Sequence, residues 1–100
     1  MVEVLLVPGC PGAQLTLQRV QAASESLGVR TNLRVLTVDR PEDATALGFV
    51  GSPTVRVDGR DLEDLGDRPF GLACRLYDNE RAPSSDLIKR AIATASGRSS

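Results

Sequence analysis

The most constraining feature of the 100-residue sequence is its opening, where an apolar run meets a break and then a helical repeat. Residues 2–7 are almost continuously apolar, the pattern of a strand buried on both faces of a sheet. Pro8-Gly9 ends that run, and apolar residues then recur every three or four positions up to Gly28, which predicts an amphipathic helix. Pro11 suits the first position of this helix because its missing N–H costs little there. Cys10 is therefore expected at the N-cap or beside it. The predicted apolar face consists of Ala13, Leu17, Val20, Ala23 and Leu27.

Later segments add strands and helices in alternation. The predicted elements are a strand over 32–38, a helix from Pro41 to Gly48, a strand over 54–57, a tight turn at Asp58-Gly59 with residues 60–62 pairing back, a short strand over 74–77, and a helix capped by Pro83-Ser84-Ser85 that runs through Ala95. The opening strand, helix and strand imply a right-handed parallel crossover, and the hairpin adds an antiparallel edge. The sequence therefore predicts an α/β fold of order β-α-β-α-β-β-α, with a central mixed sheet flanked by helices. Residues 1–97 form a single domain, and residues 98–100 are expected to be a frayed tail.

Histidine is absent, and this restricts the chemistry more than the charge does. Without it the chain has no Ser-His-Asp or Cys-His catalytic group and no histidine-containing zinc site. Two cysteines, Cys10 and Cys74, cannot build a four-cysteine cluster. The formal net charge of −1 argues against a nucleic-acid partner, which normally requires a basic excess on one face. The nucleophilic candidates are therefore the two thiols, and neither a metal nor a resident cofactor is predicted.

No segment of the sequence approaches the roughly 20 apolar residues that cross a bilayer. The apolar run at the N-terminus is too short for a signal peptide, and it carries Glu3 where a signal peptide has basic residues. A cytoplasmic protein with reduced thiols and no membrane partner is therefore expected.

Three pieces of the sequence, taken in order, carry a resemblance to a known family. They are Gly9-Cys10-Pro11 after the first strand, the stretch Gly51-Ser52-Pro53-Thr54-Val55-Arg56-Val57-Asp58-Gly59, and Cys74-Arg75-Leu76-Tyr77. Together with the long helix that opens at the cysteine, they resemble the thioredoxin-like superfamily over residues 2–95. More narrowly, the chain resembles small bacterial thioredoxin-like proteins, some of which are labelled alkylmercury lyase. The resemblance implies thiol-disulfide exchange, with Cys10, Pro53 and Cys74 as the catalytic candidates.

The same resemblance implies that Pro53 is in the cis form and faces Cys10. A cis bond would expose the backbone of Ser52 to an incoming extended chain or thiol adduct, which can pair with it as an extra strand. The physical reason for a cysteine at a helix start is independent of the family. Unpaired N–H groups and the helix dipole stabilise a thiolate, which is the nucleophilic form of cysteine. The substrate-binding candidates are Pro11, Gly12, Ser52 and Thr54.

The sequence departs from a dithiol enzyme at one position. Ala13 stands where a Cys-x-x-Cys motif has its second cysteine, so the thiol that normally releases the mixed disulfide is missing there. Three alternatives stay open. Cys10 exchanges as a monothiol with a small thiol or a protein disulfide, or Cys74 resolves it from a distance, or redox activity is lost and the chain is a non-catalytic binding module.

Two further kinds of ligand are candidates for the thiols. Soft-metal or organomercurial binding through Cys10 and Cys74 is an alternative, because thiolates select such ions. Glutathione is a candidate co-substrate, although the sequence has no good counterpart of the glutaredoxin segment that holds the glutathione carboxylate.

Acidic residues gather between positions 58 and 67 and have the oxygen ligands that a hard cation prefers. Arginines interleave with them, and the spacing matches no calcium-binding loop. A solvated loop is therefore the preferred interpretation. The acids are Asp58, Asp61, Glu63, Asp64 and Asp67.

Overall fold

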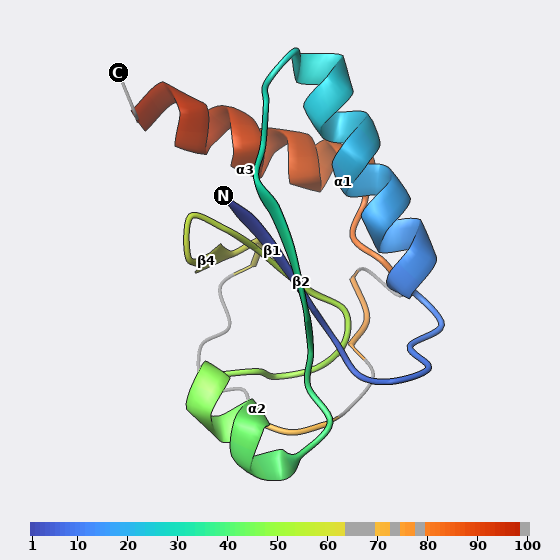
Figure 1. Cartoon of the computed structure of the whole chain (residues 1–100). Coiled ribbons are helices and arrows are strands. Elements are labelled where there is room, and N and C mark those ends of the chain that lie inside the picture. The colour runs from blue at the N-terminus through green and yellow to red at the C-terminus, as the bar shows by residue number, and fades with distance from the viewer. Residues whose placement is uncertain (64–69, 73–74, 78–79, 99–100) are drawn as a thin grey trace.

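The computed structural model describes residues 1–63, 70–72, 75–77 and 80–98, and it has a mixed α/β architecture (Figure 1). The elements are β1 (Val2–Leu6), α1 (Ala13–Leu27), β2 (Leu33–Thr37), α2 (Pro41–Leu47), β3 (Thr54–Val57), β4 (Arg60–Asp61) and α3 (Ser85–Arg98). Their order is the predicted β-α-β-α-β-β-α. Among the described residues, no helix is both long enough and apolar enough to cross a membrane.

The four strands form one mixed sheet in the order β2-β1-β3-β4. β1 lies in the middle, parallel to β2 and antiparallel to β3, and β3 pairs antiparallel with β4. The predicted parallel crossover and the antiparallel edge are thus both confirmed. The central strand β1 carries the longest apolar run because it is buried on both faces along most of its length.

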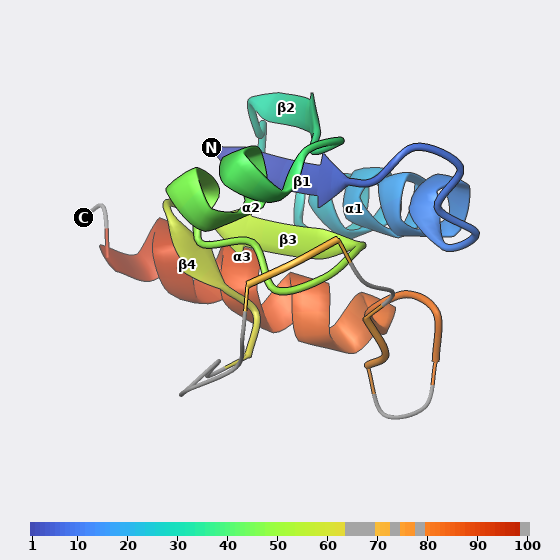
Figure 2. The ribbon, with the colours of Figure 1, turned by 90° about the horizontal axis from the view of Figure 1, so that it is seen from below.

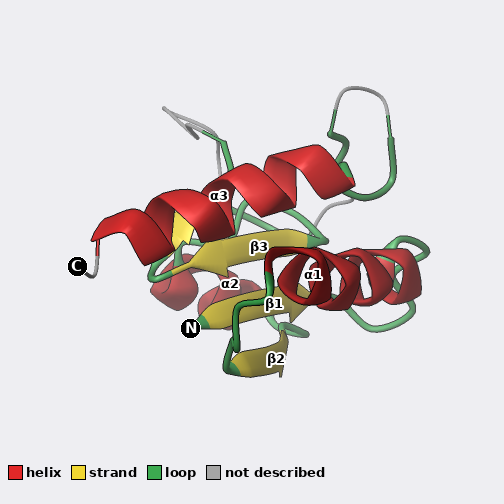
Figure 3. Cartoon of the chain, turned by 90° about the horizontal axis from the view of Figure 1, so that it is seen from above, coloured by secondary structure: helices red, strands yellow, loops and turns green. Residues whose placement is uncertain are grey.

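Each face of the sheet has its own apolar core, since neighbouring residues of β1 point to opposite sides. Val4 belongs to the core formed with α1 and α3, which includes Val20 and Ile88. Leu5 belongs to the core on the other face, where it meets Phe49 and, from α2, Ala44. Figure 2 looks at the α2 side of the sheet, and Figure 3 looks at the side that α1 and α3 cover.

The predicted C-terminal ends of α1 and α2, the predicted cap of α3 and the predicted hairpin turn are confirmed. Gly28 and Gly48 end α1 and α2 in the left-handed conformation, both with φ of 64°, which a glycine adopts without steric penalty. Asp58 and Gly59 also have positive φ values, 51° and 83°, as a two-residue hairpin turn requires. Ser84 caps α3, because its Oγ accepts a hydrogen bond from the amide of Leu87 at 3.1 Å.

Two predicted boundaries of the main helices are wrong. α1 begins at Ala13 rather than at Pro11, because a turn occupies the intervening residues. Its buried face also includes Thr16, whose hydroxyl bonds back to the carbonyl of Gly12 at 2.7 Å, whereas Leu27 is exposed at the last turn. α3 continues through Gly97 to Arg98, since a glycine costs a helix only about 1 kcal/mol.

The strand predicted over 32–38 is confirmed as β2, an edge strand whose side chains are mostly exposed because, among the described residues, only β1 pairs with it. Another predicted strand differs from the structure. The strand predicted over 74–77 is absent at its described residues: the amide of Arg75 bonds the carbonyl of Ser52, and Tyr77 forms an isolated bridge with Glu80. A ladder cannot continue there, because Pro53, next to Ser52, has no N–H to donate.

Candidate functional site

Cys10 lies where two consecutive β-turns meet, between the end of β1 and the start of α1. In the first turn, the amide of Cys10 bonds the carbonyl of Val7 at 3.2 Å, with Pro8 and Gly9 at the corners. Gly9 has a φ of 73°, which makes this a type II turn, the type that Pro-Gly favours. In the second turn, the amide of Ala13 bonds the carbonyl of Cys10, also at 3.2 Å. Both backbone polar groups of Cys10 are therefore engaged, which fixes its position.

Gly12 is the N-cap of α1, and it is a position where only glycine fits. Its φ and ψ of −94° and 2° are those of the last corner of a type I turn. It is buried, and a Cβ added to it would collide with the carbonyl oxygen of Arg81. The start of α1 therefore packs directly on the segment that precedes α3.

The first turn of α1 leaves backbone donors free. Thr16 is the first residue of the helix whose amide bonds back four residues, to Gly12 at 3.0 Å. Among the described residues, the amides of Gln14 and Leu15 have no hydrogen-bond acceptor, no side chain caps the helix, and its first turn holds no acid. This end of α1 is therefore electropositive and open to an anion.

Cys10 is half-buried and packs beside the core that α1 and α3 share. Within the described part of the chain, no hydrogen bond reaches this sulfur, and no disulfide involves it. The expected support of the thiol by the helix amides is thus not made in this conformation, because the helix starts three residues after Cys10. Cys74, the second predicted thiol, lies outside the described residues.

The segment that leads into β3, here called the Pro53 loop (residues 51–54, the last of which begins β3), contains a cis peptide bond between Ser52 and Pro53, as the resemblance implies. It is tied to the Cys10 turns by one hydrogen bond, from the amide of Val7 to the Oγ of Ser52 at 3.1 Å. Val7 comes two residues after Leu5, which pairs with Thr54, so the end of β1 lies beside this loop. Cys10 is therefore one turn away from the Pro53 loop.

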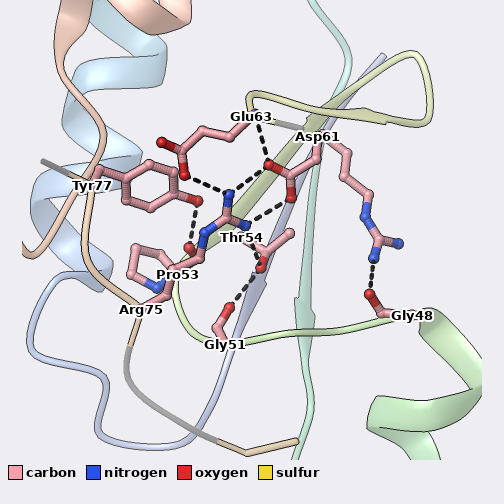
Figure 4. Close-up of polar contacts among 9 residues, drawn as sticks. Gly48, Gly51, Pro53, Thr54, Asp61, Glu63, Arg75 and Tyr77 are labelled. Atoms are coloured by element: carbon pink, nitrogen blue, oxygen red, sulfur yellow. Dashed lines mark hydrogen bonds and ion pairs between the residues drawn. The ribbon is translucent and has the colours of Figure 1, made fainter. Parts of the chain in front are cut away.

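The Pro53 loop is buried rather than exposed, and this corrects the expectation of an open groove at Ser52. Ser52 is 2% exposed, and Pro53 and Thr54 are fully buried. The amide of Arg75 donates to the carbonyl of Ser52 at 2.8 Å. The hydroxyl of Tyr77 donates to the carbonyl of Pro53 at 2.7 Å (Figure 4). Residues 75–77 of the same chain thus bond the backbone carbonyls with which a substrate strand was expected to pair.

Arg75 anchors this segment through a buried polar cluster. Its guanidinium makes a bidentate ion pair with Asp61, at 2.7 and 2.6 Å, and a second ion pair with Glu63 at 3.1 Å (Figure 4). It also donates to the hydroxyl of Thr54 at 3.3 Å and lies over the ring of Tyr77, 4.4 Å from the centroid. The side chains of Arg75 and Asp61 are only 3% and 6% exposed, so these charges interact largely shielded from water.

Burial has opposite effects on the two ionisable groups that meet here. For Arg75 it opposes the charged form, but the hydrogen bond with Asp61 and the nearby negative charges outweigh it, so the pKa lies above its ordinary value. For Tyr77 burial favours the neutral phenol and raises the pKa well above the ordinary value, although the charge of Arg75 opposes this. At neutral pH Arg75 is therefore a cation and Tyr77 a hydrogen-bond donor.

The preferred interpretation of the acidic stretch is wrong at Asp61. Instead of facing solvent, this carboxylate is buried against Arg75, and Glu63 joins it. Asp58 is exposed as expected and pairs with the N-terminal ammonium at 2.8 Å. Among the described residues, no group of three or more acids, cysteines or histidines comes together as a metal site.

The structure divides the predicted site residues into two groups. Cys10, Pro11 and Gly12 belong to the turns before α1, where Pro11 is exposed. Ser52, Pro53 and Thr54 are buried beneath residues 75–77. The hydrogen bond between Val7 and Ser52 links the two groups.

The residues that sequence reasoning missed are Asp61, Glu63, Arg75 and Tyr77. One signal was available: an arginine and a tyrosine two residues apart in an apolar stretch are candidates for burial with a partner. Nothing local in the sequence, however, selects Asp61 as that partner from the other acids of the 58–67 stretch.

Comparison with known proteins adds no relative to these observations. No protein-family model matches the sequence, and a search of curated proteins finds no match.

Proposed function

We propose that the chain is a thioredoxin-like monothiol protein that exchanges disulfides through Cys10. The arrangement of secondary structure supports the fold part of this proposal. A parallel β1–α1–β2 unit is followed by an antiparallel β3–β4 hairpin and a last helix, with α1 and α3 on one face and α2 on the other. A cis proline stands directly before β3, opposite the end of β1 that leads to the cysteine.

The observation that carries the functional part is the position of the thiol. Cys10 is free and half-buried, and the turn that holds it leads straight into the electropositive end of α1. The unpaired amides of Gln14 and Leu15 lie at that end. They favour negative charge nearby, and the attacking form of cysteine is the anion. A reduced thiol also suits a reducing compartment, so the proposed location is the cytosol.

The proposed reaction needs no second cysteine in the chain. The Cys10 thiol loses its proton to solvent, and the thiolate attacks one sulfur of a disulfide R–S–S–R. A bond forms between Cys10 and that sulfur, and the old S–S bond breaks. The electron pair leaves with the other sulfur, which takes up a proton as R–SH. A thiolate from a second small thiol then attacks the adduct, regenerates Cys10 and releases a new disulfide. Oxidised and reduced partners balance, and the protein returns unchanged.

The test is adduct formation and turnover with bis(2-hydroxyethyl) disulfide at pH 7. Trypsin separates the two cysteines, because Arg19 and Arg60 lie between them. Mass spectrometry of the digest, after free thiols are blocked, is expected to find the 2-mercaptoethanol adduct first on the peptide that contains Cys10. Added 2-mercaptoethanol is expected to remove the adduct again.

Two variants sharpen this test. Cys10→Ser should abolish both the adduct on that peptide and the turnover, since a hydroxyl does not form a mixed disulfide. Cys74→Ser separates the monothiol reaction from resolution by the second cysteine: a trapped adduct on Cys10 in this variant would assign the release step to Cys74. Preferential modification of Cys74 in the unchanged chain would contradict the proposal.

A non-catalytic binding module is the second candidate, and the edge strand β2 favours it. Leu33 and Val35 of this strand are 46% and 48% exposed, and its outer edge is unpaired by any described residue. Such an edge can take up an extended partner strand. This candidate predicts that Cys10→Ser leaves every binding measurement unchanged. The alternative of soft-metal binding depends on Cys74 and stays a prediction.

A further inference from the structure

The edge of β3 that an incoming strand would use is already paired by the chain itself. The carbonyl of Val55 accepts the amide of Leu62 at 3.3 Å, and the carbonyl of Ser52 accepts the amide of Arg75 at 2.8 Å. The carbonyl of Pro53 is taken by the hydroxyl of Tyr77 at 2.7 Å. From Ser52 to Val55 the backbone therefore has few free hydrogen-bonding groups with which a second chain could pair.

Displacing residues 75–77 from this edge would cost considerable free energy, because side-chain contacts as well as backbone hydrogen bonds hold the segment in place. The side chain of Arg75 is held by Asp61 through two hydrogen bonds and by Glu63 through a third. A peptide that replaced residues 75–77 would have to separate a buried cation from its carboxylates. Replacing one main-chain hydrogen bond by another would not supply enough free energy to offset the loss of these ion pairs.

We infer that the disulfide partner of Cys10 is a small thiol that makes no main-chain pairing with the Pro53 loop, rather than an extended polypeptide or a peptide thiol. The inference rests on the proposed function, since it assigns the substrate class of the same cysteine. Cys10 is half-buried and its neighbour Pro11 is exposed, whereas Ser52 and Pro53 are closed by the chain's own residues 75–77. Recognition of the partner is therefore limited to the sulfur and the atoms next to it.

The test compares two disulfides that share one leaving group, 5-thio-2-nitrobenzoate. One carries 2-mercaptoethanol, and the other carries the cysteine of the neutral capped peptide Ac-Ala-Val-Cys-Val-Ala-NH2. Cys10 attacks the sulfur of the mercaptoethanol or peptide half, and the coloured thiolate leaves with the electron pair. The rate of adduct formation on Cys10 is followed by mass spectrometry of its tryptic peptide. The same two rates measured in 8 M urea give the intrinsic preference of the unfolded chain.

The expected result is that folding gives the peptide probe no advantage: the ratio of peptide to mercaptoethanol rates is the same as in urea, or lower. A ratio raised by about tenfold or more on folding, the effect of one or two added main-chain hydrogen bonds, would overturn the inference and leave the proposed function intact. If folded Cys10 reacts with neither probe while the unfolded chain reacts with both, the proposed function fails and the inference fails with it.

Tyr77→Phe provides a graded version of the same test. It removes only the hydroxyl that closes the carbonyl of Pro53 and keeps the ring that Arg75 covers. If the contacts that residues 75–77 make with the Pro53 loop exclude peptides, this variant should have a higher ratio of peptide to mercaptoethanol rates than the unchanged chain. An unchanged ratio, in a variant whose circular dichroism shows it folded, would mean that this contact does not exclude peptides.

Discussion

The turns around Cys10 and the cluster around Arg75 differ in how their polar groups are satisfied. Cys10 has both backbone groups bonded but a sulfur with no donor among the described residues, and the amides of Gln14 and Leu15 nearby are free. In the cluster, Arg75 has two carboxylates, a hydroxyl and an aromatic ring around it, with only its buried Nε unpaired within the described chain.

This difference separates stability from reactivity. The Arg75 cluster is charged and largely buried, so a substitution there should mainly lower the free energy of unfolding. The Cys10 turns carry the proposed nucleophile next to free helix amides, so replacing the sulfur should mainly abolish disulfide exchange and change stability little. The predictions below test that separation, beginning with the largest effect on stability.

Arg75→Met is expected to lower the free energy of unfolding by about 3–5 kcal/mol, because it leaves Asp61 without its cation in a buried site. Urea denaturation at pH 7 measures the loss. Arg60→Met is the matched control, since Arg60 lies on β4 beside Asp61 but is exposed. Equal losses for the two variants would show that the cluster does not support the fold.

Gly12→Ala is expected to destabilise the chain by about 1–3 kcal/mol, as overpacking of a filled site does. The new methyl group would meet the carbonyl oxygen of Arg81, which belongs to backbone and cannot turn aside. Gly71→Ala is the control, because no atom of the described residues lies within 4 Å of a Cβ at that position. Chemical denaturation of both variants decides the point, and a Gly12→Ala protein as stable as its control would place the start of α1 away from Arg81.

Tyr77→Phe is expected to cost about 1–2 kcal/mol at neutral pH, since it leaves the carbonyl of Pro53 without its donor. The stability of the unchanged chain should also depend on alkaline pH. Because folding raises the pKa of Tyr77, its contribution is complete below the unfolded value of about 10 and is lost as the pH rises above it.

Absorbance at 295 nm checks the titration directly, because Tyr77 is the only tyrosine and the chain has no tryptophan. The folded chain should remain unionised at a pH where the chain in 8 M urea is half ionised. Matching titration curves in the two states would contradict the buried hydrogen bond, and an unaltered alkaline slope in Tyr77→Phe would assign that slope to another group.

Cys10→Ser should change stability least, by less than about 1 kcal/mol, since Cys10 is half-buried and its sulfur has no hydrogen bond to the described residues. It should nevertheless remove adduct formation with bis(2-hydroxyethyl) disulfide completely. A loss of stability as large as that of Gly12→Ala would indicate that Cys10 serves mainly to pack the core and not to react with disulfides.

The element order could be predicted from local patterns. The apolar run of β1, the glycines that end α1 and α2, and the Asp58-Gly59 turn each act within a few residues of chain. The start of α1 was misplaced because Pro11 also suits a turn corner. The repeated Pro-Gly, at 8–9 and 11–12, was the signal for two consecutive turns that would have moved the helix start to Ala13.

The candidate site was only partly predictable, because its decisive contacts are long-range. The cis bond at Pro53 follows from a motif, but the closure of that loop depends on Arg75 and Tyr77, more than 20 positions later. A buried ion pair such as Arg75–Asp61 is selected by the packed fold and leaves no periodic pattern in the sequence. An open groove was therefore the natural expectation, and the structure closes it.

The most direct test of the central claim, that folding activates Cys10, is its alkylation rate by iodoacetamide at pH 7, folded and in 8 M urea. The tryptic peptide that contains Cys10 reports this rate separately from that of Cys74. The account predicts faster alkylation of Cys10 in the folded chain, because the turn that holds this cysteine leads directly into the electropositive start of α1. Slower alkylation in the folded chain than in urea would contradict it and identify Cys10 as a packing residue.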